Sequence, residues 1–392
     1  MTHAISMPRR LALLLAVLSA VAVLLSGCGT PAEGRDDASG THIITDVQGR
    51  KVTVPKNPKR ILLSGQRELY TTALLNPENP LDKIAGWPDD LKENDADTYN
   101  RYLQKFPQLA KIPVTGELWD GSFSLEQALQ TRPEVFVLSA SSYQAAEEAG
   151  IITGFEKAGV PTVVIDYFVE PVKNTVPSVR IMGQLFDREK QAENFILFYE
   201  SKVSAVTDRL KEKKPEATKA LLWRAPGYFD CCQTFKNSNL SKIVSAAGGA
   251  NIGDELLDSE QGTLSPEAVA KANPQVILAT GANWSPETTP VKEGGFVPLG
   301  YETTPDKAAA AWKQVIDAQP VIKEMAAVKD RRAFAAWHHF YDSPYNFLAV
   351  EWFAQALHPE LFSDLDVEGD FRELHSQFLP VEAGGTFWTG LP

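Results

Sequence analysis

Residues 122–137 read SFSLEQALQTRPEVFV, and residues 263–278 align with them without a gap as TLSPEAVAKANPQVIL. Each copy contains Ser-x-Glu, a short helical segment, a proline and an apolar run typical of a buried strand. Ser124 and Ser265 have the residue type and position of helix N-caps. The repeat therefore predicts a chain built from two similar α/β halves.

The glutamates of the two copies, Glu126 and Glu267, lie two residues after the caps. A carboxylate in the first turn interacts favourably with the helix dipole, and this is the simpler interpretation of both residues. The same glutamate in each half also forms a pseudo-symmetric pair of exposed carboxylates. Such a pair suits a partner with two-fold symmetry.

Short apolar runs recur along both halves. They occupy residues 60–64, 83–87, 133–139 and 161–166 in the first half and residues 220–223, 275–279 and 333–337 in the second. Short runs of Val, Ile and Leu that alternate with helical segments are typical of parallel strands covered by helices on both faces. The predicted fold class is therefore α/β, with two Rossmann-like lobes of parallel sheet.

A single long helix is predicted between the halves. From Ala192 to Leu210, apolar residues recur at steps of three and four. Residues 187–189 give this helix an acidic start, and the lysines among residues 211–214 give it a basic end, as the helix dipole favours. About 25 residues make a rod of about 40 Å, which favours a helix that joins two lobes. An ordinary surface helix of a single domain is the alternative.

The N-terminus has the pattern of a secretory signal. Two arginines precede an apolar run at residues 11–25, which is shorter than the ~20 residues of a membrane-spanning helix. The run is followed by Ser-Gly-Cys and resembles a bacterial lipobox, which implies that Cys28 is lipid-modified and becomes the mature N-terminus. The protein is then expected outside the cytoplasm, anchored to the cell membrane by this lipid. A plain signal peptide with an incidental cysteine is the alternative.

These patterns divide the chain into five predicted segments. They are a signal peptide (1–27), a flexible tether (28–41), an N-terminal lobe (42–186), a linking helix (187–214) and a C-terminal lobe (215–392). The tether is predicted because its residues are polar and punctuated by Gly and Pro. The 392 residues, 44% of them hydrophobic, are enough for two ordinary cores.

The net charge of −12 without basic runs argues against nucleic acid and against a second, electrostatic contact with a membrane. Cys231 and Cys232 are adjacent, so a vicinal disulfide and two free thiols both remain open. The sequence has neither a zinc-ligand spacing nor a nucleophile elbow, P-loop or dinucleotide fingerprint. We therefore expect no catalytic residues, no protein-bound metal and no cofactor.

The order of signal, tether, lobe, long helix and lobe resembles the bacterial solute-binding proteins of ABC importers for iron-siderophore complexes and cobalamin. The resemblance covers residues 42–388 and is carried by the paired Ser-x-Glu motifs, by AAGGANI at 246–252 and by WHHFYDSPYN at 337–346. In that family the two glutamates contact arginines of the permease dimer, and the resemblance implies this role for Glu126 and Glu267. The implied partners are a permease dimer with its ATPase and a ferric siderophore, and the protein is expected to be a monomer.

Ligands of parallel sheets bind beyond the carboxyl ends of the strands, and ligands of two-lobed proteins bind in the cleft between the lobes. Residues near the ends of the predicted strands and loops are therefore the ligand-binding candidates: Arg67, Trp87, Trp119, Tyr143, Arg224, Tyr228, Trp284, His339 and Tyr341. Aromatic rings pack the organic part of a siderophore. The two arginines, one from each half, would offset the charge of a ferric catecholate or carboxylate.

The histidine pair at residues 338–339 leaves a second ligand class open. A continuing strand would send the two rings to opposite faces, so at most one would face the cleft. His339 or Tyr341 would suffice as an axial ligand, so a haem receptor, or a cobalamin receptor of the same family, is the alternative. Capture of bare zinc or manganese is not expected from so few histidines. An exported enzyme on the same architecture is a more distant alternative.

Overall fold

The computed structural model describes residues 40–284 and 294–392, and its first lobe is built on a four-stranded sheet. The strands are parallel and run in the order β4-β3-β5-β6. Their bounds are β3 (Ile61–Leu63), β4 (Ile84–Gly86), β5 (Val135–Ser139) and β6 (Thr162–Ile165). All four lie within the apolar runs that the sequence predicts as strands.

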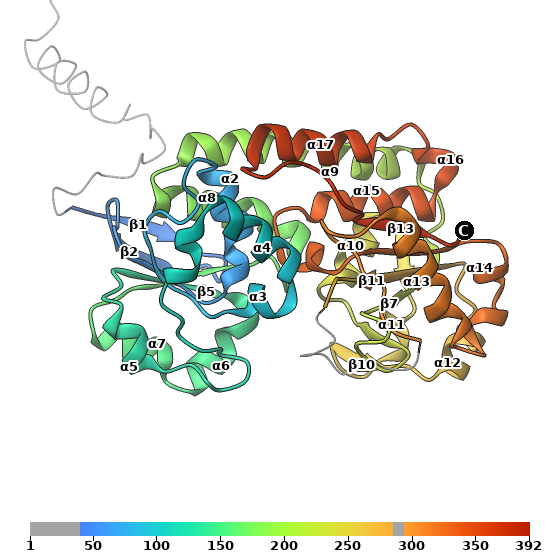
Figure 1. Ribbon diagram of the computed structural model, residues 1–392, viewed down its shortest axis with the longest axis horizontal. Coiled ribbons are helices and arrows are strands. Elements are labelled where there is room, and N and C mark those ends of the chain that lie inside the picture. Colours follow the sequence, from blue (N-terminus) through green and yellow to red (C-terminus); the bar gives the residue numbers. More distant parts are fainter. Residues whose placement is uncertain (1–39, 285–293) are drawn as a thin grey trace, which may run out of the picture. The chain divides into compact units, whose positions relative to one another are not determined.

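Helices cover both faces of this sheet (Figure 1). Leu62, Phe136 and Val164 share a core with α5, α6 and α7, whereas their neighbours Ile61 and Val137 belong to the main core of the protein. This alternation explains why the strands are apolar at every position. The helices and turns of the lobe are η1 (Gln66–Glu68), α2 (Leu69–Leu75), α3 (Asp90–Asn94), α4 (Ala96–Lys105), η2 (Pro107–Lys111), α5 (Leu125–Gln130), η3 (Ala140–Ser142), α6 (Tyr143–Glu148), α7 (Ile151–Lys157) and α8 (Pro171–Phe186). The strands β1 (Thr41–Thr45) and β2 (Lys51–Pro55) form a separate two-stranded sheet.

The second lobe contains a five-stranded sheet in the order β13-β12-β11-β7-β9. Only β13 is antiparallel to its neighbour in this sheet. The strand bounds are β7 (Thr218–Trp223), β9 (Gly249–Asn251), β11 (Val276–Gly281), β12 (Ala333–Trp337) and β13 (Trp388–Gly390), and β8 (Gln233–Phe235) pairs with β10 (Gln261–Thr263) outside it. The sequence predicts β7, β11 and β12 and misses the other four, which have three residues each.

The helices of the second lobe alternate with its strands. The Ala-rich stretch before β12 and the apolar stretch after residue 344 are helical, as α13 and α15. The elements are α10 (Leu240–Ala246), α11 (Gly253–Leu256), α12 (Pro266–Ala272), α13 (Pro305–Asp317), η4 (Ile322–Glu324), α14 (Ala326–Lys329), η5 (His338–Asp342), α15 (Asn346–Leu357), α16 (Pro359–Phe362) and α17 (Val367–Phe378).

The sequence repeat is also a structural repeat, because α5 and β5 correspond to α12 and β11. Ser124 Oγ accepts a hydrogen bond from the Gln127 amide at 3.3 Å, and Ser265 Oγ accepts one from the Ala268 amide at 3.1 Å. Both predicted N-caps are thus confirmed. The first-turn carboxylates that follow them are exposed in both copies.

The long helix α9 (Glu189–Lys213) has 25 residues and connects the two lobes, as predicted. It packs against α2 and α8 of the first lobe and against α15 of the second (Figure 1). The Tyr199 hydroxyl donates to Asn346 Oδ1 at 2.8 Å in this contact. The same hydrophobic core contains buried residues of both lobes. The two lobes therefore share one hydrophobic core, and the lobe boundaries stay a prediction from the sequence.

Cys231 and Cys232 form a vicinal disulfide across a cis peptide bond. The Cys232 amide donates to the Leu264 carbonyl at 2.9 Å, and the Leu264 amide donates to the Cys232 carbonyl at 3.1 Å. These bonds hold the disulfide against the segment that enters α12. Of the two states that the sequence leaves open, the structure has the disulfide.

The predicted signal peptide, Cys28 and nearly all of the predicted tether lie outside the described residues. Within residues 40–284 and 294–392, the search for a helix long and apolar enough to cross a membrane finds none.

Glu351 gives the fold a testable dependence on pH. It is fully buried on α15, where burial and the neighbouring Asp370 carboxylate raise its pKa from 4.5 to about 9. The folded chain therefore holds a proton that the unfolded chain loses, so stability falls as the pH rises from about 4.5 towards 9. We expect Glu351→Gln to remove this slope, of up to about 1.4 kcal/mol per pH unit. Urea denaturation of both proteins at pH 5 and pH 8 measures it, and equal pH dependence in the two would contradict the assignment.

Candidate functional site

The strands of both sheets end at a common cleft between the lobes. Ser64, Ser139 and Phe168 lie at or just beyond the ends of β3, β5 and β6 in the first lobe. Arg224 and Tyr341 lie beyond β7 and β12 in the second. The cleft has a volume of about 510 Å³, and a recess of about 60 Å³ shares part of its lining. Its position is the one expected for the ligand of two parallel sheets.

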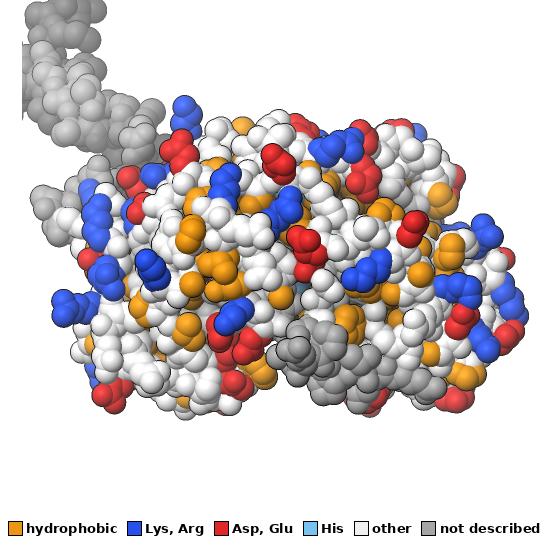
Figure 2. Space-filling model, in the orientation of Figure 1, with side chains coloured by type: hydrophobic (Ala, Val, Ile, Leu, Met, Phe, Trp, Pro, Cys, Tyr) orange, Lys and Arg blue, Asp and Glu red, His pale blue; other side chains and the backbone are white. Residues whose placement is uncertain are grey.

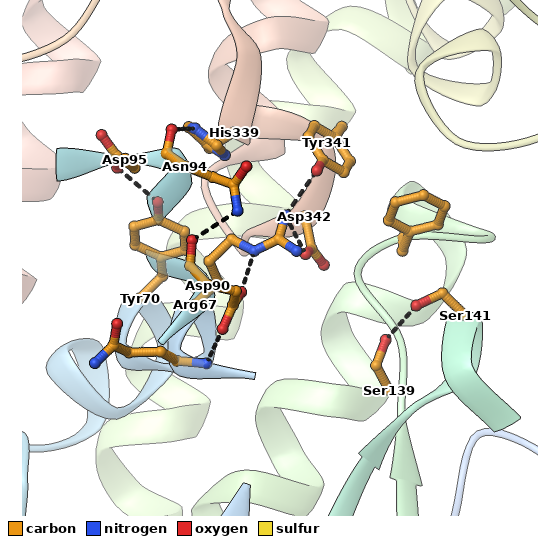
Figure 3. Close-up of polar contacts among 12 residues, drawn as sticks. Arg67, Tyr70, Asp90, Asn94, Asp95, Ser139, Ser141, His339, Tyr341 and Asp342 are labelled. Atoms are coloured by element: carbon orange, nitrogen blue, oxygen red, sulfur yellow. Dashed lines mark hydrogen bonds and ion pairs between the residues drawn. The ribbon is translucent and has the colours of Figure 1, made fainter. Parts of the chain in front are cut away.

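Arg67 lies at the centre of a polar network that joins the two lobes (Figure 3). Its Nε is 2.5 Å from Asp90 Oδ2, and its Nη1 is 3.0 Å from Asp342 Oδ2. The same Nη1 donates a hydrogen bond to the Tyr341 hydroxyl at 2.6 Å. Asp90 belongs to the first lobe, whereas Tyr341 and Asp342 belong to the second. One guanidinium therefore binds groups from both walls of the cleft.

This network corrects the expected role of Arg67. The residue lines the cleft, as predicted, but Asp90 and Asp342 already balance its charge. A guanidinium with two carboxylate partners has little attraction left for an anionic ligand. Its contribution here is to neutralise two acidic groups and to connect the lobes.

Arg224 lies in the opposite wall and has different surroundings. Its Cζ atom is 4.5 Å from the ring centroid of Phe229 and 5.1 Å from that of Phe235. Its Nη1 donates to Gln233 Oε1 at 3.2 Å. Among the described residues, its Nε has no hydrogen-bond partner and no carboxylate forms an ion pair with it. Within this part of the chain, Arg224 is the cleft arginine with hydrogen-bonding capacity left for a ligand.

Aromatic rings form the recess beside the cleft. The Trp284 ring centroid is 5.0 Å from that of Tyr228 and 5.3 Å from that of His338. The Tyr341 ring is 4.7 Å from His338 and meets Phe168 of the first lobe edge to face at 5.2 Å. Rings held in this way give a rigid apolar wall for the organic part of a ligand.

His338 and His339 both line the recess, so the expectation that their rings point to opposite faces of a strand is wrong. The strand β12 ends before His338, and the 3₁₀ helix η5 begins there. His338 Nδ1 is hydrogen-bonded to Thr280 Oγ1 at 2.8 Å, and His339 Nε2 donates to the Asn94 carbonyl at 2.9 Å. Burial lowers the pKa of His339 to about 3 and that of His338 well below its ordinary value, so both rings are neutral at pH 7.

The structure brings together most of the residues predicted to bind ligand. Those that line the cleft or its recess are Arg67, Trp119, Arg224, Tyr228, Trp284, His339 and Tyr341. Several further lining residues are absent from the candidates predicted from the sequence: Glu68, Asp90, Asn94, Glu117, Phe168, Phe229, Gln261 and Asp342. The expectation that ligands bind beyond the ends of parallel strands includes Phe168, which follows β6 closely. It does not indicate Glu117, which lies in a loop.

Trp87 and Tyr143 do not line the cleft, which corrects two predictions. Trp87 follows β4, but residues 113–115 cover that strand end, because the Trp87 amide donates to the Pro113 carbonyl at 3.1 Å and the indole is fully buried. Tyr143 follows the extra turn η3, which carries it away from the end of β5. Its ring instead lies 5.2 Å from the Arg50 guanidinium.

Comparison with known proteins identifies relatives of the whole two-lobed body. A family model described as "Periplasmic binding protein" matches residues 81–336. The chain is 22% identical over 273 residues to the ABC transporter substrate-binding lipoprotein YvrC of Bacillus subtilis, which covers 68% of this chain and 79% of YvrC. The structure of the TroA-like periplasmic binding protein FepB from Veillonella parvula matches with a TM-score of 0.81 at 26% identity, over 89% of this chain and 99% of FepB. Molybdate-bound MolA of Haemophilus influenzae matches with a TM-score of 0.64 at 18% identity, over 88% and 99%.

The two cleft arginines are expected to differ in their effect on stability. Arg67→Met leaves two partly buried carboxylates without their cation and should cost about 3–5 kcal/mol of unfolding free energy. Arg224→Met removes one hydrogen bond and ring contacts and should cost about 1–2 kcal/mol. Urea denaturation of the unliganded proteins measures both.

Rescue provides the control for this comparison. Adding Asp342→Asn to Arg67→Met removes one of the uncompensated charges and should restore part of the lost stability. Equal and small losses for the two single variants, without rescue, would show that Arg67 is not needed to balance the acidic groups.

Proposed function

The chain belongs to the periplasmic binding protein family, and on that premise we propose that it is the extracytoplasmic substrate-binding component of an ABC importer, with a ferric siderophore as its ligand. In this function, the complex is captured in the cleft between the lobes and is then delivered to the permease. The family is one of transport proteins rather than enzymes, and we propose no catalytic activity.

The observation that carries the proposal is the size of the cleft together with its aromatic lining. A volume of about 510 Å³ is in the range of organic ligand sites and far exceeds the needs of a bare ion. Among the described residues, no group of three or more His, Cys, Asp or Glu side chains is arranged to hold a metal ion. A metal that arrives already wrapped in an organic chelator needs rings and hydrogen bonds rather than protein ligands.

Haem is the alternative ligand in the same cleft, and cobalamin is a second organic metal complex that belongs to this alternative. The sequence offers His339 and Tyr341 as axial ligands. His339 Nε2 donates to the Asn94 carbonyl, and among the described residues its Nδ1 has no hydrogen-bond partner. The Tyr341 hydroxyl accepts from Arg67, and its oxygen has a further lone pair for a metal. Both residues therefore retain a lone pair for an axial bond to iron, and haem stays the second candidate ligand.

Membrane anchoring is part of the proposal. Cys28 follows a pattern that resembles a lipobox, and YvrC, to which the chain is similar, is a lipoprotein by name. We propose that a lipid on Cys28 holds the protein at the outer side of the cell membrane, as a monomer that meets the permease dimer and its ATPase there.

Measurements on the purified protein should identify its ligand directly. We expect native mass spectrometry to detect an iron chelate bound to a fraction of the protein, and ferric siderophores added to the unliganded protein to quench its tryptophan fluorescence, because Trp119 and Trp284 line the site. A Soret band would indicate haem instead. Binding of molybdate, without binding of any ferric chelate, would overturn the proposed ligand.

Docking to the permease is proposed for Glu126 and Glu267. Each is an exposed carboxylate at the start of an equivalent helix, and α5 and α12 lie at the same edge of the molecule, one on each lobe (Figure 1). Charge pairs at the rim of an interface mainly tune association. We expect each single Glu→Ala variant to slow uptake partially, and the double variant nearly to abolish it, with ligand affinity unchanged.

Helix capping is the competing role for these glutamates. It predicts a loss of about 0.3–1 kcal/mol of stability per site, and reduced uptake only through lower protein abundance. Thermal midpoints, ligand affinity and uptake at matched protein levels separate the two roles. Normal uptake by the double variant at equal abundance would leave only the capping role.

A further inference from the structure

Acidic groups outnumber basic groups in the described lining of the cleft. The carboxyl groups are those of Glu68, Asp90, Glu117 and Asp342, and the guanidinium groups are those of Arg67 and Arg224. Asp90 and Asp342 are the ion-pair partners of Arg67, and Glu68 and Glu117 interact only with its more distant charge. The first-lobe wall therefore presents two carboxyl groups for which the described residues supply no ion-pair partner. Figure 2 shows acidic side chains gathered on this lobe between α3 and α6.

Glu117 is the carboxyl group in this wall that most clearly lacks a partner. The residue is 92% buried, and among the described residues its Oε1 atom has no hydrogen-bond partner. Burial, followed by the charge of Asp90, raises the pKa of Glu117 to about 8. A buried polar group without a partner costs free energy, and such groups in native proteins are rare unless they have a function.

The backbone around Glu117 holds this arrangement in place. The Glu117 amide donates to Ser122 Oγ at 2.8 Å, and the Phe123 amide donates to the Glu117 carbonyl at 2.9 Å. The loop is closed further by the Ser122 amide, which donates to Asp120 Oδ1 at 2.8 Å. These three hydrogen bonds close the loop, so the backbone of Glu117 is held in a fixed position at the cleft.

The same loop carries Trp119, whose side chain also lines the cleft. Trp119 is 70% exposed, the largest exposed fraction among the large hydrophobic side chains described. An exposed indole at a binding cleft has a free aromatic face, and the face of Trp is the best of the aromatic side chains for binding a cation. A carboxyl group and an indole face two residues apart therefore have the same preference for a positively charged partner.

We propose that Glu117 and Trp119 form a subsite for a positively charged nitrogen on the ligand, so that the ferric complex captured here is neutral or cationic rather than anionic. The proposal rests on the proposed function and names the charge class of its ligand. Arg224 and the aromatic recess then contact the neutral, oxygen-rich and apolar parts of the chelate from the other lobe. A ferric tris-catecholate, which is strongly negative, offers no cation to the Glu117 carboxyl group, whereas an ammonium group would favour its ionised form.

Three iron complexes test this charge preference. Ferrioxamine B is a ferric trihydroxamate with one free ammonium group, its N-acetylated derivative lacks only that charge, and ferric enterobactin is a strongly negative tris-catecholate. Fluorescence titrations at one fixed pH should show ferrioxamine B binding at least ten-fold more tightly than the acetylated complex, and ferric enterobactin binding most weakly. Glu117→Gln should remove the preference for the ammonium group, so that the two trihydroxamates bind with equal affinity.

Two further variants test the contribution of Trp119 and provide a control. Trp119→Leu should reduce the same preference by several-fold, whereas Glu156→Gln, which removes an exposed carboxylate from α7 in the same lobe, should leave all three affinities unchanged. Equal binding of the two trihydroxamates, a preference that survives Glu117→Gln, or tightest binding of the tris-catecholate would overturn the subsite but keep the ferric-siderophore function. Absence of binding for all three complexes would overturn the function, and the subsite with it.

Discussion

Parallel strands present their carboxyl ends at one edge of a sheet, and this constraint explains most of the site. The cleft is lined from β3, β5 and β6 in one lobe and from β7, β11 and β12 in the other. The two edges can face a common cleft because the 25-residue helix α9 packs against helices of both lobes and carries the chain from one sheet to the next. The core that surrounds this helix contains residues of both lobes, so the stability of the fold and the geometry of the cleft depend on the same packing.

Hydrogen bonds between the lobes add a second constraint. Besides the Arg67 network, the Asn283 side chain donates to Asp97 Oδ1 at 2.9 Å, and the Tyr345 hydroxyl donates to the Tyr70 carbonyl at 3.0 Å. The second of these is fully buried. Buried hydrogen bonds are costly to break without replacement, so large opening of the lobes is disfavoured. Recognition then depends mainly on the shape and charge of a preformed cleft, and a ligand gains affinity by matching groups that are already fixed in position.

Periodicity and capping residues were sufficient to predict the architecture but not the chemistry of the site. Long apolar runs, the paired N-caps Ser124 and Ser265 and the α9 pattern are local signals, and each was confirmed. The three-residue strands and the turn at His338 have no period to detect, and Trp87 lies in the core because a distant loop covers the end of β4. Arg67 lines the cleft, but its partner Asp90 comes from another element, so the balance of its charge depends on tertiary structure.

The charge of the cleft shows why residue types alone mislead about a ligand. Two arginines at strand ends indicate an anion if each is counted as free, as the sequence-based prediction assumes. In the folded chain, one arginine has two carboxylate partners, and Glu117 on a neighbouring loop has an oxygen with none among the described residues. Free energy on binding comes from groups that are unsatisfied before the ligand arrives, because satisfied pairs must first be broken. Among the described residues, Glu117 Oε1 and Arg224 Nε both lack a partner. The information about ligand charge therefore lies in these two groups on opposite walls of the cleft, and not in the guanidinium of Arg67.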